Sequence, residues 1–144
     1  MRRFLLLAAM ASFAGGSPAA ADSAAATIER LGLSGTWASY CTGGADRSKP
    51  GLRIVFAAPP DSAPTYTTIS SDGRVTTTVR SSVLEAAPVE DGKIRLRLRI
   101  IGGDRDGGPL PDTMTNTFEQ VIEKTGEGIR LVGLDPRFIQ KCPE

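Results

Sequence analysis

The stretch Leu33-Ser-Gly-Thr-Trp-Ala-Ser-Tyr-Cys41 contains the only Trp of the chain and one of its two Cys residues. The other is Cys142. In an exported chain, two Cys residues usually form one disulfide. A bridge that closes about 100 residues stabilises the fold by roughly 4–5 kcal/mol. The sequence therefore predicts a Cys41–Cys142 disulfide that joins an early strand to the tail, with intermolecular pairing or free thiols as the alternatives.

The first residues have the pattern of a secretory signal peptide. Arg2 and Arg3 precede an apolar run over Phe4–Ala14, and small residues follow at Ala19–Ala21. We expect cleavage after Ala21 and a periplasmic or secreted protein. An uncleaved anchor is the alternative, although the apolar run is shorter than the roughly 20 residues of a membrane-spanning helix.

The signal peptide over 1–21 leaves a single expected domain over 22–144. Two of the 17 basic residues and none of the 16 acidic residues lie in the signal, so the mature chain has 15 against 16 and a net charge of −1. A nearly neutral domain has no overall field that would capture nucleic acid. No second stretch is apolar enough to cross a membrane. We therefore expect neither a nucleic-acid partner nor a membrane span in the mature chain.

The segment Lys93–Ile101 shows the clearest strand pattern. Ile, Leu, Leu and Ile alternate with Lys, Arg, Arg and Arg, which places the apolar residues on one face and the basic residues on the other. The pairs Asp72-Gly73 and Asp91-Gly92 each lie between two such segments and predict hairpin turns. The basic face is interpreted as a solvated outer face paired with Glu119 and Glu123, or alternatively as a surface for polyanions or acidic lipids.

Similar patterns predict an all-β fold of about eight antiparallel strands. A sheet of this size avoids exposed edges by closing into a barrel, and an eight-stranded barrel is filled by side chains or holds one small ligand. A short helix over Ser23–Leu31 and a helical turn from Asp135-Pro136 complete the expected fold. The expected strands are Leu33–Cys41, Leu52–Ala57, Thr65–Ser70, Arg74–Arg80, Ser82–Val89, Lys93–Ile101, Thr113–Glu123 and Ile129–Leu134.

The residues for the commonest catalytic chemistries are missing. The chain has no His, which excludes Ser-His-Asp and Cys-His nucleophiles and nearly all zinc sites. Asp104 and Asp106 resemble part of a calcium loop, but the closing Glu is missing, so a surface loop is expected over Gly102–Pro111. We expect a protein without enzyme activity, metal or cofactor, and a His-free hydrolase is a minor alternative.

Gly35-Thr36-Trp37 follows a short helix and begins the first strand, and this arrangement resembles the Gly-x-Trp signature of lipocalins and related calycins. The family's Thr-Asp-x-Tyr motif is absent. In that family the Trp closes the base of the barrel and a basic residue of the last strand packs on it, a role that the resemblance assigns to Arg130. Avidin-like barrels share the tripeptide, and some exported bacterial protease inhibitors are also small disulfide-bridged barrels.

The leading hypothesis is an exported, non-enzymatic barrel that binds a small apolar or amphipathic molecule, with Trp37 and Arg130 as candidate ligand-binding residues. Trp37 has a second interpretation, as a plug at one end of the barrel. The alternative hypothesis is a protein-interaction module, such as a protease inhibitor or an envelope partner, that acts through surface loops Thr42–Gly51 and Gly102–Pro111.

Overall fold

The computed structural model describes residues 23–42, 49–59, 61–111 and 116–144. One helix and nine strands are assigned within these residues. Their bounds are α1 (Ala24–Arg30), β1 (Gly35–Ala38), β2 (Gly51–Ala57), β3 (Thr65–Ser71), β4 (Thr76–Glu90), β5 (Lys93–Arg105), β6 (Gly108–Pro109), β7 (Thr117–Thr125), β8 (Gly128–Leu131) and β9 (Gln140–Lys141). The signal peptide expected over 1–21 lies outside the described residues.

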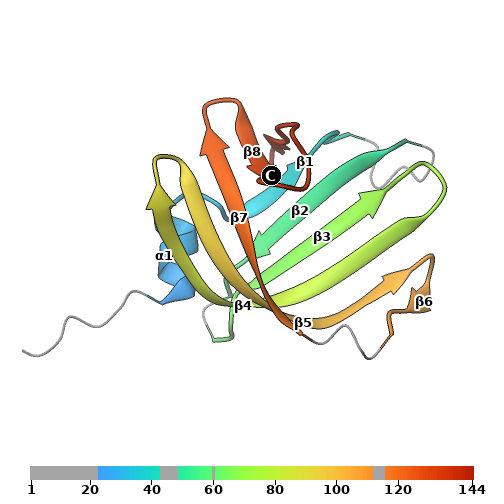
Figure 1. Ribbon diagram of the computed structural model, residues 1–144, viewed down its shortest axis with the longest axis horizontal. Coiled ribbons are helices and arrows are strands. Elements are labelled where there is room, and N and C mark those ends of the chain that lie inside the picture. Colours follow the sequence, from blue (N-terminus) through green and yellow to red (C-terminus); the bar gives the residue numbers. More distant parts are fainter. Residues whose placement is uncertain (1–22, 43–48, 60, 112–115) are drawn as a thin grey trace, which may run out of the picture.

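The strands form a nearly closed antiparallel barrel (Figure 1). Their order around the sheet is β8-β7-β5-β4-β3-β2-β1-β9, and β6 pairs only with β5. The sheet closes where Ile129 and Ile139 exchange backbone hydrogen bonds, with N···O distances of 3.0 and 2.7 Å. The barrel and its antiparallel pairing confirm the predicted fold class.

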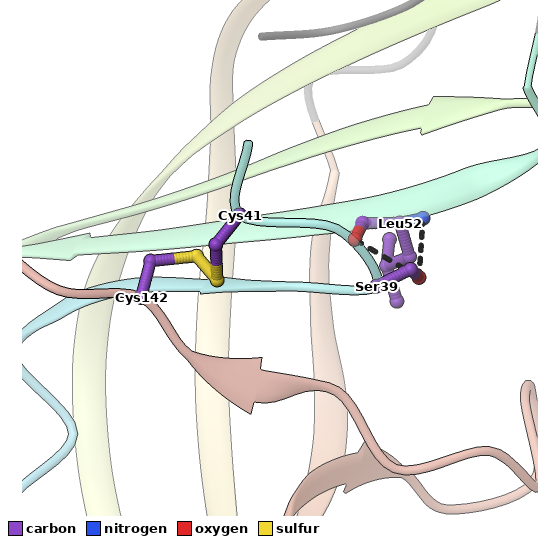
Figure 2. Close-up of a disulfide and its surroundings, with 4 residues drawn as sticks. All are labelled: Ser39, Cys41, Leu52 and Cys142. Atoms are coloured by element: carbon purple, nitrogen blue, oxygen red, sulfur yellow. Dashed lines mark hydrogen bonds between the residues drawn. A yellow bond between two sulfur atoms is a disulfide. The ribbon is translucent and has the colours of Figure 1, made fainter. Parts of the chain in front are cut away.

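The disulfide between Cys41 and Cys142 confirms the predicted pairing. The two Cα atoms are 5.3 Å apart although 101 positions separate the residues in sequence. Ser39 directly follows β1, and its hydroxyl accepts a hydrogen bond from the Leu52 amide and donates one to the Leu52 carbonyl, at 3.1 and 3.3 Å. Figure 2 shows the chain turning back beyond Ser39, which brings Cys41 beside the segment that carries Cys142. The bridge therefore holds the short strand β9 against β1.

Both predicted hairpin turns are present. In the β3–β4 turn, Asp72 Oδ1 accepts hydrogen bonds from the amides of Arg74 and Val75, each at 2.8 Å. These backbone donors lower the pKa of Asp72. In the β4–β5 turn, Gly92 has a φ of +71°, and a Cβ at this position would lie 2.8 Å from the Lys124 carbonyl oxygen. Gly is therefore required there for conformation and for space.

Three segments differ from the predictions. The two strands expected over 74–89 are one continuous strand, β4, because bulges between Arg80 and Ser81 and between Val83 and Glu85 absorb the shift in register. The loop expected over Gly102–Pro111 is instead the end of β5 and β6, joined by a turn at 106–107. The C-terminal helical turn falls earlier, where Leu131 O accepts hydrogen bonds from the amides at 134 and 135, and the tail then forms β9.

Helix α1 covers one end of the barrel, beside the β4–β5 turn in Figure 1. Ser23 caps it by accepting a hydrogen bond from the Ala26 amide at 3.2 Å, and Gly32 follows it with a φ of +66°. Lys124 at the end of β7 donates to the Leu31 carbonyl at 2.8 Å. The fully buried Ile28 joins the helix to the barrel core. The core consists of Ile28, Leu33, Trp37, Ile54, Phe56, Tyr66, Val83, Ile94, Leu96, Leu98, Ile122, Ile129, Leu131 and Ile139.

Candidate functional site

The inward side chains become more exposed with distance from α1. Along β5, Leu96 and Leu98 are fully buried, whereas Ile100 on the same face is half-buried. Along β7 the exposed fraction rises from 0% at Ile122 through 7% at Gln120 to 36% at Phe118. These residues share one face because side chains alternate along a strand. The exposure of the inward face therefore rises toward the end opposite α1.

The strands on the other side of the barrel show the same gradient. On β2, Ile54 is fully buried and Leu52 is half-buried. On β3, Tyr66 is 3% exposed, Thr68 is half-buried and Ser70 is exposed. The inward face is thus buried at the α1 end and more exposed at the other. We call the inward face of this more exposed end the cup; its residues are Leu52, Thr68, Ser70, Val79, Ile100 and Phe118.

Two residues that carry hydroxyl groups lie where the buried part of the inward face meets the cup. Ser81 is directly opposite Tyr66 on the neighbouring strand. Ser81 is fully buried and its Oγ has no hydrogen-bond partner in the described part of the chain. The Tyr66 ring packs against Phe56 with centroids 5.2 Å apart. Burial raises the pKa of Tyr66, so its phenol stays protonated as a hydrogen-bond donor.

A buried hydroxyl without a partner costs about 1–3 kcal/mol. The Ser81 side chain is therefore an unfavourable choice for a purely structural position at the inner end of the cup. A ligand group that accepted and donated hydrogen bonds there would remove this penalty. The sequence analysis did not identify Ser81 or Tyr66 as site residues. Ser81 lies between Val79 and Val83 at alternate positions, and this pattern places it on the apolar face of the strand.

Trp37 lies in the core rather than on an open surface. Its exposed fraction is 4%, and its indole Nε1–H donates to the Leu33 carbonyl at 2.8 Å. Trp37 pairs with Ile54, which pairs with Thr68 of the cup. The ring is therefore a buried member of the cross-strand row that leads through Ile54 to Thr68. Lys141 of β9 has its ammonium 5.9 Å from the centre of the ring.

Arg130 does not lie with Trp37. It is the residue between the inward Ile129 and Leu131 on β8, so it faces out of the barrel. Its guanidinium forms an ion pair with Glu123 and lies 5.0 Å from the centre of the Phe138 ring. The cation over Trp37 is Lys141, which reaches the ring because β9 pairs with β1.

The basic face of β5 is exposed on the outside of the barrel. The predicted pairing with β7 is present, with Arg97 opposite Glu119 and Lys93 opposite Glu123. The ion pairs of this face within the described residues, however, join β5 to β4. Arg97 binds Glu85 at 3.0 Å and Lys93 binds Glu90 at 3.2 Å. Glu123 is instead paired with Arg130.

The two loops expected to contact a protein partner have different outcomes. Most of Thr42–Gly51 lies outside the described residues, and Gly102–Pro111 is a β5–β6 hairpin. A different segment exposes apolar side chains. Leu134 and Val132, in the turn after β8, are 72% and 37% exposed.

Within residues 23–42, 49–59, 61–111 and 116–144, no three His, Cys, Asp or Glu side chains gather where they could hold a metal ion. No described helix combines the length and the apolar character needed to span a bilayer. In comparisons with protein families, characterised proteins and solved structures, nothing matches the chain.

Proposed function

We propose that this chain is an exported, non-enzymatic barrel that binds a small amphipathic molecule in the cup. The observation that carries the proposal is the gradient of exposure along the inward faces of β2, β3, β5 and β7. Ligand sites are typically concave and largely apolar, with a few polar groups that orient the ligand. The half-buried Leu52, Val79 and Ile100 supply the apolar wall. Ser81 and Tyr66 supply hydroxyls for a polar group that reaches the inner end.

Export is supported by two features. The disulfide is consistent with an oxidising compartment, and the sequence of residues 1–21 has the pattern of a cleaved signal. A non-enzymatic role is supported by the chain's lack of His, which removes the commonest general base. Trp37, buried in the row that leads through Ile54 to Thr68, would contribute to the site through packing.

Native mass spectrometry of protein purified from its own host tests the proposal directly, because a retained small molecule adds mass. A dansyl-labelled fatty acid provides a defined probe for titration. Val79→Phe fills the cup and should weaken probe binding roughly tenfold, since overpacking costs about 1–3 kcal/mol. Thr78→Phe adds the same bulk to the opposite face and is the matched control. Equal affinities for the two variants, or no bound probe in the wild type, would refute the proposal.

Ser81→Ala separates the polar contact from the apolar one. Because it removes a buried hydroxyl without a partner, thermal stability should stay constant or rise. Probe affinity should fall if that hydroxyl binds the polar group. A drop in stability with unchanged affinity would assign Ser81 a purely structural role and confine binding to the apolar wall.

A protein-interaction module is the second candidate function, and the exposed Leu134 favours it. The turn is ordered by hydrogen bonds from the amides of Leu134 and Asp135 to the Leu131 carbonyl, at 3.3 and 3.2 Å. Leu134→Asp should abolish binding of an envelope protein or protease, whereas Val89→Asp, on an exposed residue of β4, should not. Crosslinking to the same partner by wild type and Leu134→Asp would exclude this surface.

A further inference from the structure

Two arginines on the outer face of β5 have no carboxylate directly opposite on either neighbouring strand. Arg95 lies between Ala87 of β4 and Val121 of β7, and Arg99 lies between Ser82 and Thr117. Both arginines are exposed, and neither forms an ion pair within the described residues. Oppositely charged side chains that face each other on neighbouring strands stabilise a sheet. Arg95 and Arg99 lack such a directly opposite partner. The stripe is therefore only partly explained as a solvated, salt-bridged face.

The remaining basic residues of the stripe are held only weakly by carboxylates. Arg97 and Glu85 have side chains that are 46% and 62% exposed, and the Glu90 side chain that pairs with Lys93 is 70% exposed. Exposed ion pairs of this kind contribute about 0–1 kcal/mol. An external anion can exchange with these carboxylates at little cost. All four basic residues are thus available to one anionic partner.

The line of cations ends in an exposed apolar residue. Ile101 is 52% exposed at the irregularity between Ile100 and Gly102, where β5 shifts register against β4. A cation row that adjoins an exposed aliphatic side chain fits an interface between charged headgroups and acyl chains. It fits a fully hydrated polyanion less well, because such a chain offers nothing apolar for Ile101 to contact.

The basic residues form one continuous row along the outer face of β5. Residues 93–101 extend over about 26 Å at 3.3 Å per residue. The carboxylates at 85, 90, 119 and 123 lie on the flanking strands β4 and β7. Along β5 itself, the outward charges from Lys93 to Arg99 are all positive.

We propose that the outer face of β5, from Lys93 to Ile101, docks the protein on an anionic lipid bilayer. The cations bind the headgroups and Ile101 enters the interface between headgroups and acyl chains. Each cation held at such a surface strengthens binding about fivefold. The proposal concerns the outside of the barrel and does not depend on the cup or its ligand.

Sedimentation with vesicles tests this surface. The full-length exported protein should bind vesicles of phosphatidylglycerol and phosphatidylcholine at low salt, and pure phosphatidylcholine vesicles far less. Binding should be lost at 1 M salt, where the screening length is about 3 Å. Absence of a preference for phosphatidylglycerol would overturn the proposal. Binding to heparin without binding to vesicles would also overturn it, because the partner would then be a soluble polyanion.

Variants locate the contact. Arg95→Gln combined with Arg99→Gln should weaken binding to the anionic vesicles about 25-fold. Arg74→Gln with Arg105→Gln is the matched control, because Arg74 lies in the β3–β4 turn and Arg105 lies on the inward face of β5. Equal losses in the two double variants would refute the assignment to β5. Ile101→Ser should weaken vesicle binding severalfold while heparin binding is retained. Unchanged vesicle binding would show that Ile101 does not contact the bilayer.

Discussion

Removal of the disulfide should produce the largest loss of stability of any conservative change in this chain. The bridge joins residues separated by 101 positions, and the chain-entropy model assigns about 5 kcal/mol to a loop of that length. Unfolding a domain of this size has an entropy near 0.25 kcal/mol per kelvin. The double variant Cys41→Ser/Cys142→Ser should therefore melt roughly 15–20 °C below the wild type.

The loss should also have a location in the fold. Only two residue pairs join β9 to β1, and one backbone pair, Ile129 with Ile139, joins the tail to β8. Without the bridge this closure depends on few contacts, so the amides of Ile129 and Ile139 should exchange with solvent earlier than amides in the long β4–β5 pairing. Hydrogen exchange with mass or NMR detection measures this difference.

The assay is thermal and urea denaturation of the wild type and the double variant, each with and without dithiothreitol. Reductant should lower the melting temperature of the wild type to that of the double variant and leave the double variant unchanged, which controls for the two Ser hydroxyls. The urea m-value should rise, since an uncrosslinked unfolded chain exposes more surface. A decrease of less than about 5 °C, or amide exchange that is unchanged at the closure, would refute the reasoning.

Three further predictions concern the core, the closure of the barrel between β8 and the tail, and the stability of the fold at low pH. Leu96→Ala should cost about 2–5 kcal/mol in urea denaturation, because the side chain is fully buried. Gly128→Ala should be far more destabilising than Gly107→Ala: both glycines have positive φ, but a Cβ at Gly128 would lie 2.1 Å from a backbone oxygen of Ile139, whereas Gly107 faces open space. A neighbouring arginine lowers the pKa of Asp135 to about 2, so its stabilising effect should be complete above pH 4 and vanish as the pH falls through 2. The difference in melting temperature between wild type and Asp135→Asn should shrink over that range, and a constant difference would contradict this assignment.

Local patterns in the sequence were sufficient for much of the architecture. Alternation in Lys93–Ile101 identified the inward face of β5, and the Asp-Gly pairs identified both hairpin turns, because these signals act between residues close in sequence. Two Cys residues allowed only one intramolecular pairing. The same local rules failed where backbone pairing overrode them. Gly102–Pro111 has a loop composition, yet part of it forms strand because β4 extends far enough to pair with it.

The tertiary structure alone decided which end of the barrel is filled and which cation meets Trp37. The sequence pattern for the cup is the same as for the core, since alternation fixes the face of a side chain but not its depth in the barrel. Depth depends on the register of strands distant in sequence and on α1, which covers only one end. Likewise, Lys141 reaches Trp37 because β9 pairs with β1, and Arg130 faces outward because its neighbours on β8 face in. Such long-range pairings follow from closure of the whole sheet and leave no local trace in the sequence.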